Sequence, residues 1–377
     1  QCVIISDKFM QRVEAGDKEA RSLWIQLLRE RLETGEPYIM FEDTVNRANP
    51  QGYKDRGLSV SMTNICSEIT LHTDDDHSFV CCLSSLNAAR WDEWKDTDLP
   101  QLAVYFLDGV ISEFIAKAKN LPGFERSVRF AEKSRAIGIG VLGWHTLLQS
   151  KMIPFESFQA MQLNSLLFKT IRDKTIIASQ DMALSHGEPE WCSGTGVRHT
   201  HLMAIAPTRS NSIISGEVSY GIEPIPANAY ADKTSKGVFL IKNPTFEALL
   251  ISKGKDVSDV WKTVVVNGGS VQHLDFLSDL EKRVFLTARE INQMALVQQA
   301  AQRQKFIDQA QSLNLFFPVN VSPKLFNDIH LEAWRLGVKT LYYCRSSSVL
   351  KGDAGTRQAE EKPKNKTNED ECLSCHG

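Results

Sequence analysis

Cysteine, excess charge of one sign and long apolar runs are all scarce in this sequence. Eight cysteines among 377 residues are too few for a disulfide scaffold, so a reducing compartment, the cytoplasm, is expected. A formal net charge of −3 leaves no basic excess for binding nucleic acid. No run of eighteen apolar residues is present, and no basic segment followed by an apolar one opens the sequence. We therefore predict no contact with a membrane and no secretory signal.

What the sequence does contain is an alternation of helical and strand patterns, with enough apolar residues (42%) for a large core. Helices are predicted at residues 17–35, 102–119, 159–186, 283–313 and 323–336. Short buried strands are predicted at residues 38–41 and 338–343. Long helices between short apolar strands are typical of a mixed α/β architecture.

The composition changes at about residue 345. Between Lys351 and Glu371, 11 of 21 residues are charged and none is aromatic, which leaves too little apolar surface to offset the entropy of ordering the chain. We therefore predict a folded domain over residues 1–344 and a flexible tail over residues 345–377. Two cysteines, Cys372 and Cys375, lie at the end of this tail.

Three local patterns resemble cofactor or metal sites but lack the context that such sites need. Residues 138–143 match the glycine pattern of dinucleotide-binding loops, but no strand precedes them and no ribose-binding acid follows, which favours tight strand packing. Residues 372–376 match a haem-attachment motif, but a tail position favours a redox-active dithiol. His199 and His201 would share one face of a strand without a third ligand, so we predict no metal site.

An amide, a thiol and a carboxylate follow one another at alternate positions, as Asn64, Cys66 and Glu68. In an extended segment alternate side chains point to the same side, so we predict that these three groups lie together. Such a set can bind a polyol, transfer a proton and carry out sulfur chemistry. Considered alone, the segment is more typical of a turn around a buried cysteine.

Two further pairs of neighbouring residues are candidates for a functional site. Cys81 and Cys82 form a second thiol site, and Tyr342 and Tyr343 place two phenols side by side near the end of the predicted domain. Taken alone, the tyrosines are most typical of a packing pair on a strand. Because neighbouring residues on a strand face opposite ways, only one cysteine of the first pair can line a site.

Together these segments resemble the large, catalytic subunit of aerobic class I ribonucleotide reductases. The resemblance spans essentially the whole chain, and its specificity comes from the order of the segments. They are residues 34–39, 64–68, 81–87, 138–141, 206–212, 221–224, 305–309 and 339–343, followed by the terminal cysteine pair.

The resemblance implies an α/β fold, the C-terminal half of a ten-stranded barrel with a central finger loop, plus the tail. The family's N-terminal half, with its allosteric sites for ATP and deoxynucleotides, has no counterpart in this sequence. We therefore expect that half as a partner, from a split gene or from processing or truncation. The resemblance further implies that this chain binds no cofactor and that the metallocofactor of a separate small subunit supplies the radical.

The resemblance also assigns roles at the centre of the site, for reduction of a ribonucleoside diphosphate. Cys66 corresponds to the cysteine that becomes a thiyl radical and removes the 3′ hydrogen of the ribose. Glu68 corresponds to the base on the 3′-OH, and Asn64 to the amide that orients the sugar hydroxyls. Cys81, rather than Cys82, corresponds to one of the two reducing thiols.

Other roles lie around that centre. Tyr342 and Tyr343 correspond to the radical relay, and Cys372 with Cys375 to a shuttle reduced by thioredoxin or glutaredoxin. The substrate phosphates are expected at Pro207, Thr208, Arg209, Ser210 and Asn211. For this loop the alternative is an ordinary helix N-cap. For the protein it is a non-catalytic remnant that only binds a partner.

Overall fold

The computed structural model describes residues 2–234, 237–318 and 320–346, and within the β5–β6 hairpin it does not describe the side chains of residues 232–238. The helices are α1 (Asp7–Ala15), α2 (Lys18–Thr34), α3 (Glu42–Arg47), α4 (Gln51–Lys54), α5 (Trp91–Trp94), α6 (Leu99–Ala118), α7 (Glu125–Ser134), α8 (Trp144–Ser150), α9 (Phe158–His186), α10 (Arg209–Ile214), α11 (Pro244–Ser252), α12 (Ser258–Val266), α13 (Asp279–Val284), α14 (Gln293–Gln304) and α15 (Pro323–Arg335). The strands are β1 (Cys2–Ile5), β2 (Tyr38–Phe41), β3 (Leu83–Asn87), β4 (Gly138–Leu142), β5 (Ala229–Thr234), β6 (Gly237–Lys242), β7 (Leu315–Phe317), β8 (Thr340–Leu341) and β9 (Cys344–Ser346).

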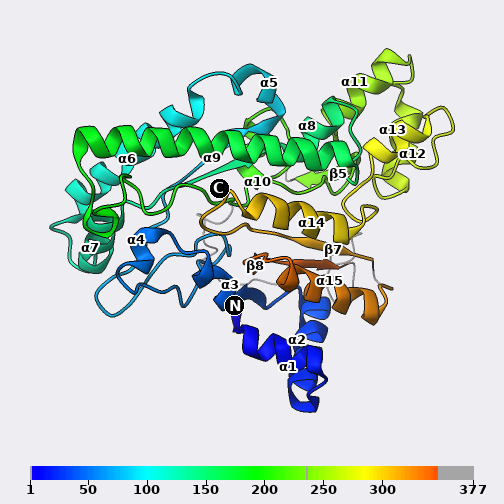
Figure 1. Cartoon of the computed structure of the whole chain (residues 1–377). Helices are drawn as coiled ribbons and strands as arrows, with labels where there is room; N and C mark the ends of the chain where they lie inside the picture. The colour runs from blue at the N-terminus through cyan, green and yellow to red at the C-terminus, as the bar shows by residue number, and fades with distance from the viewer. Residues whose placement is uncertain (1, 235–236, 319, 347–377) are drawn as a thin grey trace.

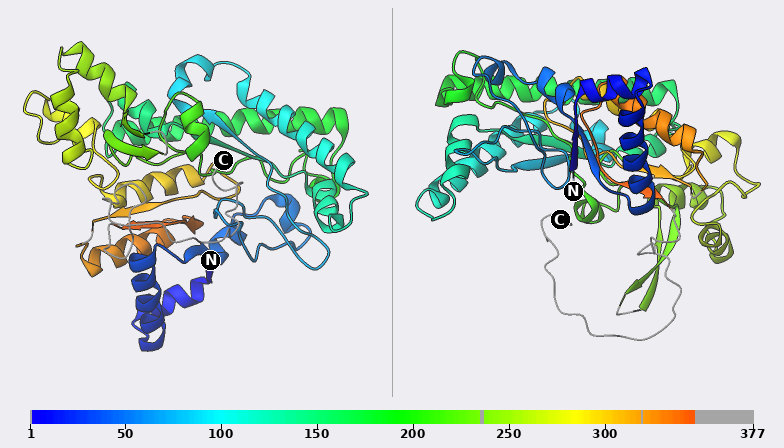
Figure 2. Two further views of the ribbon diagram at one scale, coloured as in Figure 1. Left: turned by 180° about the vertical axis from the view of Figure 1, so that it is seen from behind. Right: turned by 90° about the horizontal axis from the view of Figure 1, so that it is seen from below.

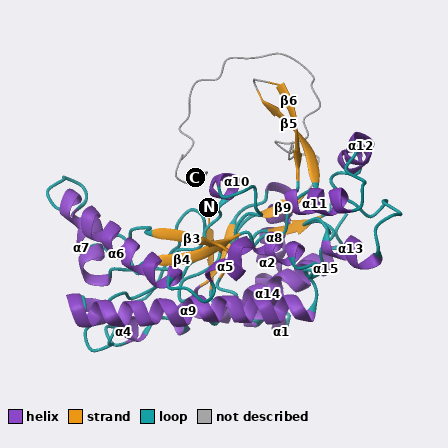
Figure 3. Cartoon of the chain, turned by 90° about the horizontal axis from the view of Figure 1, so that it is seen from above, coloured by secondary structure: helices purple, strands orange, loops and turns teal. Residues whose placement is uncertain are grey.

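Short strands form the centre of the molecule and long helices cover them. β2 pairs in parallel with β1 and antiparallel with β8, while β3 pairs in parallel with β4, and β7 with β9. A bridge between Ile205 and Gln311 adds two further extended segments. The long helix α9 runs along these strands, as Figure 1 shows, and Figure 3 shows the β5–β6 hairpin projecting away on the other side.

The predicted helices 17–35, 102–119, 159–186 and 323–336 are confirmed as α2, α6, α9 and α15. Local signals explain the accuracy of the ends. The side chain of Asp17 accepts a hydrogen bond from the backbone N–H of Ala20 (2.9 Å), and Gly35 closes the same helix at a φ of 91°. Ser157 caps α9 in the same way, and the helix ends at Gly187.

The predicted helix over residues 283–313 is wrong, because two separate helices with loops between and after them occupy this region. The carboxylate of Glu290 accepts hydrogen bonds from the backbone N–H and the hydroxyl of Thr287 (both 2.8 Å), which closes a turn. Asn292 then caps α14, which ends at Gln304. Beyond it the chain runs beside other central segments, where the N–H of Ser312 donates to the carbonyl of Ile205 (2.9 Å).

The last predicted strand and the predicted domain boundary also differ from the structure. The strand expected at residues 338–343 is reduced to β8, because the N–H of Tyr342 donates instead to the carbonyl of Leu313 (2.9 Å). β9 continues to Ser346, so a boundary after residue 344 falls inside a strand. Of the predicted tail, residues 347–377 lie outside the described residues.

Two glycines of the 138–143 segment allow β4 to lie against its neighbours. A Cβ atom at Gly140 would lie 2.4 Å from the carbonyl oxygen of Ala204, and one at Gly138 would lie 2.4 Å from the side chain of Leu83. Every residue of β4 is buried. Tight strand packing, as expected, accounts for these glycines.

Helix α6 is long and apolar enough, by length and composition alone, to cross a membrane. A single such helix among the described residues is weak evidence, because core helices pass the same test. α6 packs against α9 and α7, and its buried Asp108 forms an ion pair with Arg135 (2.6 Å). These contacts are those of a helix that covers a protein core.

Candidate active site

The segment from Asn64 to Glu68 forms a tight turn rather than the extended segment that was predicted. The N–H of Ser67 donates to the carbonyl of Asn64 (3.1 Å), and Ser67 adopts a φ of 68°. The side-chain oxygen of Asn64 accepts a hydrogen bond from the N–H of Ile69 (3.1 Å). The turn brings two of the three predicted groups together, because the Asn64 amide bonds to the carboxylate of Glu68. Cys66 and Glu68 are both buried.

Ser312 holds this turn against the central segments and was not predicted. Its hydroxyl lies 2.5 Å from the carbonyl oxygen of Cys66 and 3.1 Å from Oε2 of Glu68, and the N–H of Ala310 donates to the Glu68 carbonyl (2.9 Å). Burial raises the pKa of Glu68, and the hydrogen bonds from Asn64 and Ser312 only partly offset that effect. The site therefore contains a carboxylate that takes up a proton more readily than one in water.

Cys66 lies in a buried aromatic cluster with the two predicted tyrosines. The thiol of Cys66 and the hydroxyl of Tyr342 share a hydrogen bond, and the ring centroids of Tyr342 and Tyr343 are 4.4 Å apart. Burial, followed by the nearness of Cys66, raises the pKa of Tyr342 well above its ordinary value, so its hydroxyl keeps its proton. A continuous path of contacting side chains thus runs from Tyr343 to the thiol.

Tyr38, from β2, is a third member of this cluster that sequence reasoning did not assign to the site. Its ring centroid lies 4.6 Å from that of Tyr342 and 4.9 Å from that of Tyr343. Its residue type was visible within segment 34–39, but nothing local indicated a contact with residues some 300 positions away. The buried guanidinium of Arg31 holds the neighbouring backbone, because it donates to the carbonyls of Pro37 and Tyr342.

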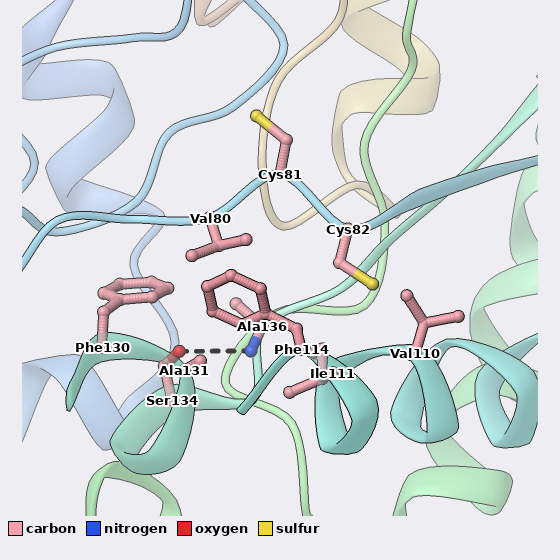
Figure 4. A pocket seen from close by; sticks show the side chains of 10 residues that line it. All are labelled: Val80, Cys81, Cys82, Val110, Ile111, Phe114, Phe130, Ala131, Ser134 and Ala136. Carbon is pink, nitrogen blue, oxygen red and sulfur yellow. Dashed lines mark hydrogen bonds between the residues drawn. The ribbon is translucent and has the colours of Figure 1, made fainter. Parts of the chain in front are cut away.

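Cys81 and Cys82 point to opposite sides of the chain just before β3, as Figure 4 shows. The thiol of Cys82 faces α6 and donates to the carbonyl of Leu107 (3.6 Å), and burial raises its pKa to about 11. Both cysteines border a cavity of about 130 Å³ with a mainly apolar lining. Cys81 is exposed. This geometry favours Cys81 over Cys82 as a reducing thiol, because Cys82 is a packing residue.

The predicted phosphate loop lies at the start of α10. Thr208 is buried, and its hydroxyl bonds to the N–H of Gly221 (2.9 Å) and to the hydroxyl of Ser212 (3.0 Å) rather than capping the helix. Arg209 and Asn211 are exposed, whereas Pro207 and Ser210 are half-buried. The loop is therefore anchored from below by Thr208 and presents its other polar groups outward.

The remaining candidates lie elsewhere. His199 and His201 do not belong to a strand, so the predicted shared face does not exist. His199 is buried and bonds to Ser179 (2.9 Å) and Asp108 (3.2 Å), and burial lowers the pKa of His201 to about 4. Cys372 and Cys375 lie outside the described residues.

Comparison with known proteins identifies the fold. The family model described as "Ribonucleotide reductase, barrel domain" matches residues 8–194 and 190–344. A putative ribonucleoside-diphosphate reductase large subunit from Frog virus 3 is 39% identical over the whole chain, which covers 68% of that protein. The large subunit from Invertebrate iridescent virus 3 is 43% identical over 95% of the chain, which covers 57% of that protein.

A solved structure agrees with these matches. The Actinobacillus ureae class Id ribonucleotide reductase alpha subunit superposes with a TM-score of 0.88 at 47% identity, and the match covers 93% of this chain and 65% of that one. The chain thus spans between about half and two thirds of the length of these relatives, which agrees with the expected part of an α/β barrel. It belongs to the ribonucleotide reductase large-subunit family and contains the family's barrel domain.

Proposed function

We propose that this chain carries the groups with which a ribonucleoside-diphosphate reductase converts ribonucleotides into deoxyribonucleotides. The observation that supports it best is the hydrogen bond between Cys66 and Tyr342, with the carboxylate of Glu68 two residues from the thiol. A buried thiol, a buried base and a path of phenols form a set that a packing role alone does not require. The non-catalytic remnant needs none of the three.

In the proposed reaction, the thiyl radical of Cys66 takes the 3′ hydrogen atom of the ribose, so that a C–H bond breaks and an S–H bond forms. Glu68 accepts the proton of the 3′-OH, and the 2′-OH leaves as water with a proton from a thiol. Two thiols, one of them Cys81, become a disulfide, and of their two hydrogens one leaves in the water and the other is added to the 2′ carbon. Glu68 returns its proton to the 3′ oxygen, and return of the hydrogen atom to the 3′ carbon restores the radical on Cys66.

The neighbouring residues would prepare these steps. Asn64 is placed by its bonds to Ile69 and Glu68 to orient the sugar hydroxyls. The segment 207–211 would hold the substrate phosphates. Tyr343 and Tyr342 would carry the oxidising equivalent to Cys66, because phenol O–H and thiol S–H bonds cost similar energies to break homolytically. A small subunit with a metallocofactor would generate that equivalent.

Two further partners belong to the proposal. The tail dithiol, Cys372 and Cys375, would reduce the active-site disulfide and be reduced in turn by thioredoxin or glutaredoxin in a reducing compartment. The N-terminal part of the large subunit, on the same or a second polypeptide, would supply the remaining barrel strands, the partner thiol and the allosteric nucleotide sites. No redox cofactor is needed on this chain.

The test is turnover of the assembled enzyme with Cys66→Ala. We expect deoxynucleotide formation to be abolished, because Cys66 is the thiol that hydrogen-bonds to Tyr342 at the end of the proposed path. Cys192→Ala is the matched control, since Cys192 is also a buried cysteine but does not belong to the cluster of Tyr38, Cys66 and Tyr342. Full turnover of Cys66→Ala would overturn the proposal, and an inactive wild-type assembly that still binds its partners would favour the remnant.

A further inference from the structure

Two histidines and an aspartate meet on the loop that connects the finger loop to β3. Nε2 of His72 lies 3.0 Å from Oδ2 of Asp74, and Nδ1 of His77 lies 2.9 Å from Oδ1 of Asp74. One ligand atom from each residue lies within 4.8 Å of the other two. We propose that this cluster binds a divalent first-row metal ion, with Zn²⁺ as the best match to its two imidazoles and one carboxylate.

The hydrogen bonds of His72 require a positive charge between His72 and Asp74. Nδ1 of His72 lies 2.6 Å from the carbonyl oxygen of Ser59. A carbonyl only accepts hydrogen bonds, so Nδ1 carries the hydrogen, and Nε2 of the neutral ring has only a lone pair. That lone pair faces a carboxylate oxygen, which also only accepts. A metal ion between the two atoms resolves this conflict.

Asp74 is suited to hold such a charge. Oδ1 accepts the backbone N–H groups of Asp76 (2.8 Å) and His77 (2.7 Å), which fixes the orientation of the carboxylate. The contact described for Oδ2 is the one with His72, so this oxygen keeps lone-pair capacity for a cation.

The surroundings match those of metal-binding histidines. Such a histidine commonly donates its other ring N–H to a carbonyl or carboxylate, as His72 does to Ser59. Edge-to-face contacts with Trp191, at centroid distances of 5.7 Å for His72 and 5.0 Å for His77, hold both rings. Ligands about 2.0–2.2 Å from Zn²⁺ lie roughly 3.3 Å apart in a tetrahedral site. Nε2 of His72 and Oδ2 of Asp74 are already 3.0 Å apart, and one ligand atom of each of the three residues lies within 4.8 Å of the others.

An ion here would stabilise the chain between two parts of the active site without touching the substrate. The loop follows Glu68 and precedes Cys81, and α7 holds its outer side. Nε of Arg129 donates to the carbonyl of Asp76 (2.9 Å), and Arg126 donates to the carbonyl of Asp74. The Asp74 side chain is 43% exposed, which leaves one side of the ion open to water. The inference is independent of the proposed catalytic function.

The experiment measures metal binding to the full chain carrying Cys372→Ser and Cys375→Ser, because the tail thiols and His376 are themselves potential zinc ligands. We expect one Zn²⁺ per chain after dialysis, a Co²⁺ spectrum without thiolate bands, and a higher midpoint of thermal unfolding with zinc. His77→Gln and Asp74→Asn should weaken binding by more than about 10–100-fold, the typical cost of changing even an outer-shell partner. The matched controls are His186→Gln and Asp75→Asn, at exposed positions.

A second measurement needs no variant and remains decisive if a substitution prevents folding. Diethyl pyrocarbonate modifies histidines, and mass spectrometry locates the modified residues. Zinc should protect His72 and His77 from modification and should leave His186 reactive. Equal binding by His77→Gln and His186→Gln would overturn the proposal. So would the absence of stoichiometric Zn²⁺ and Co²⁺ binding.

Discussion

The finger loop and the phosphate loop are built in opposite ways. The finger loop, residues 64–68, buries Cys66 and Glu68, and the residues that hold it come from distant parts of the chain. Ser312, for example, lies 244 positions from Glu68. The phosphate loop consists of consecutive residues, with one buried anchor, Thr208, and outward-facing side chains such as Arg209. When a buried side chain held by distant residues is removed, no other group can make its contacts. When an exposed side chain on a loop is removed, water or a neighbouring residue can take over its interactions.

The largest effect is expected at the tyrosine cluster. Tyr342→Phe should abolish turnover, because the ring still packs but has no O–H bond to break between Tyr343 and Cys66. The measurement is deoxynucleotide formation by the assembled enzyme, with near-ultraviolet circular dichroism to verify packing. Tyr105→Phe, on the outer face of α6, is the control and should retain full activity. A normal rate for Tyr342→Phe would show that Tyr342 is not needed for radical transfer. The expected difference in tolerance to substitution between the two regions would then be lost.

Sequence reasoning succeeded wherever the signal was local. Asp17 and Gly35 give the ends of α2, and Gly187 ends α9, because caps depend on a few adjacent residues. The helix predicted over residues 283–313 failed since a helical apolar pattern does not show the turn closed by Glu290.

The candidate site, like the fold, could be predicted only where the signal was local. The residue types at Asn64, Cys66 and Glu68 led to the proposed chemistry, but these residues lie in a turn rather than in the predicted extended segment. Ser312 and Tyr38 could not be found, because their roles exist only through contacts across hundreds of positions. The His72 cluster does not match the usual sequence pattern of a zinc site, because a carboxylate lies between two imidazoles instead of paired cysteines or histidines.

An intermediate effect is expected from Ser312→Ala. The Ser312 hydroxyl helps to lower the pKa of Glu68, which burial raises, so its loss should raise that pKa further. Glu68 must be ionised to act as a base, and activity falls as the pH drops through its pKa. The acidic limb of the kcat/KM profile should therefore move to higher pH, with a loss of about tenfold below the wild-type pKa, from a hydrogen bond worth about 1–3 kcal/mol.

The control for this change is Ser185→Ala, at an exposed position on α9. A purely structural role for Ser312 would lower the unfolding midpoint and leave the shape of the pH profile unchanged. If the acidic limb does not shift, Ser312 holds the turn in place but does not influence the pKa of Glu68.

The smallest effect is expected from Arg209→Gln on the phosphate loop. Arg209 is exposed, and an ion pair in water contributes only about 0.2–1 kcal/mol, so KM should rise about two- to fivefold with kcat nearly unchanged. The dependence of KM on salt should weaken as well, because screening acts on the charge that was removed. Lys324→Gln, at an exposed position on α15, is the control. A loss in kcat as large as that of Ser312→Ala would show that the loop closes over the substrate and becomes buried, and the two regions would then differ only before the substrate binds.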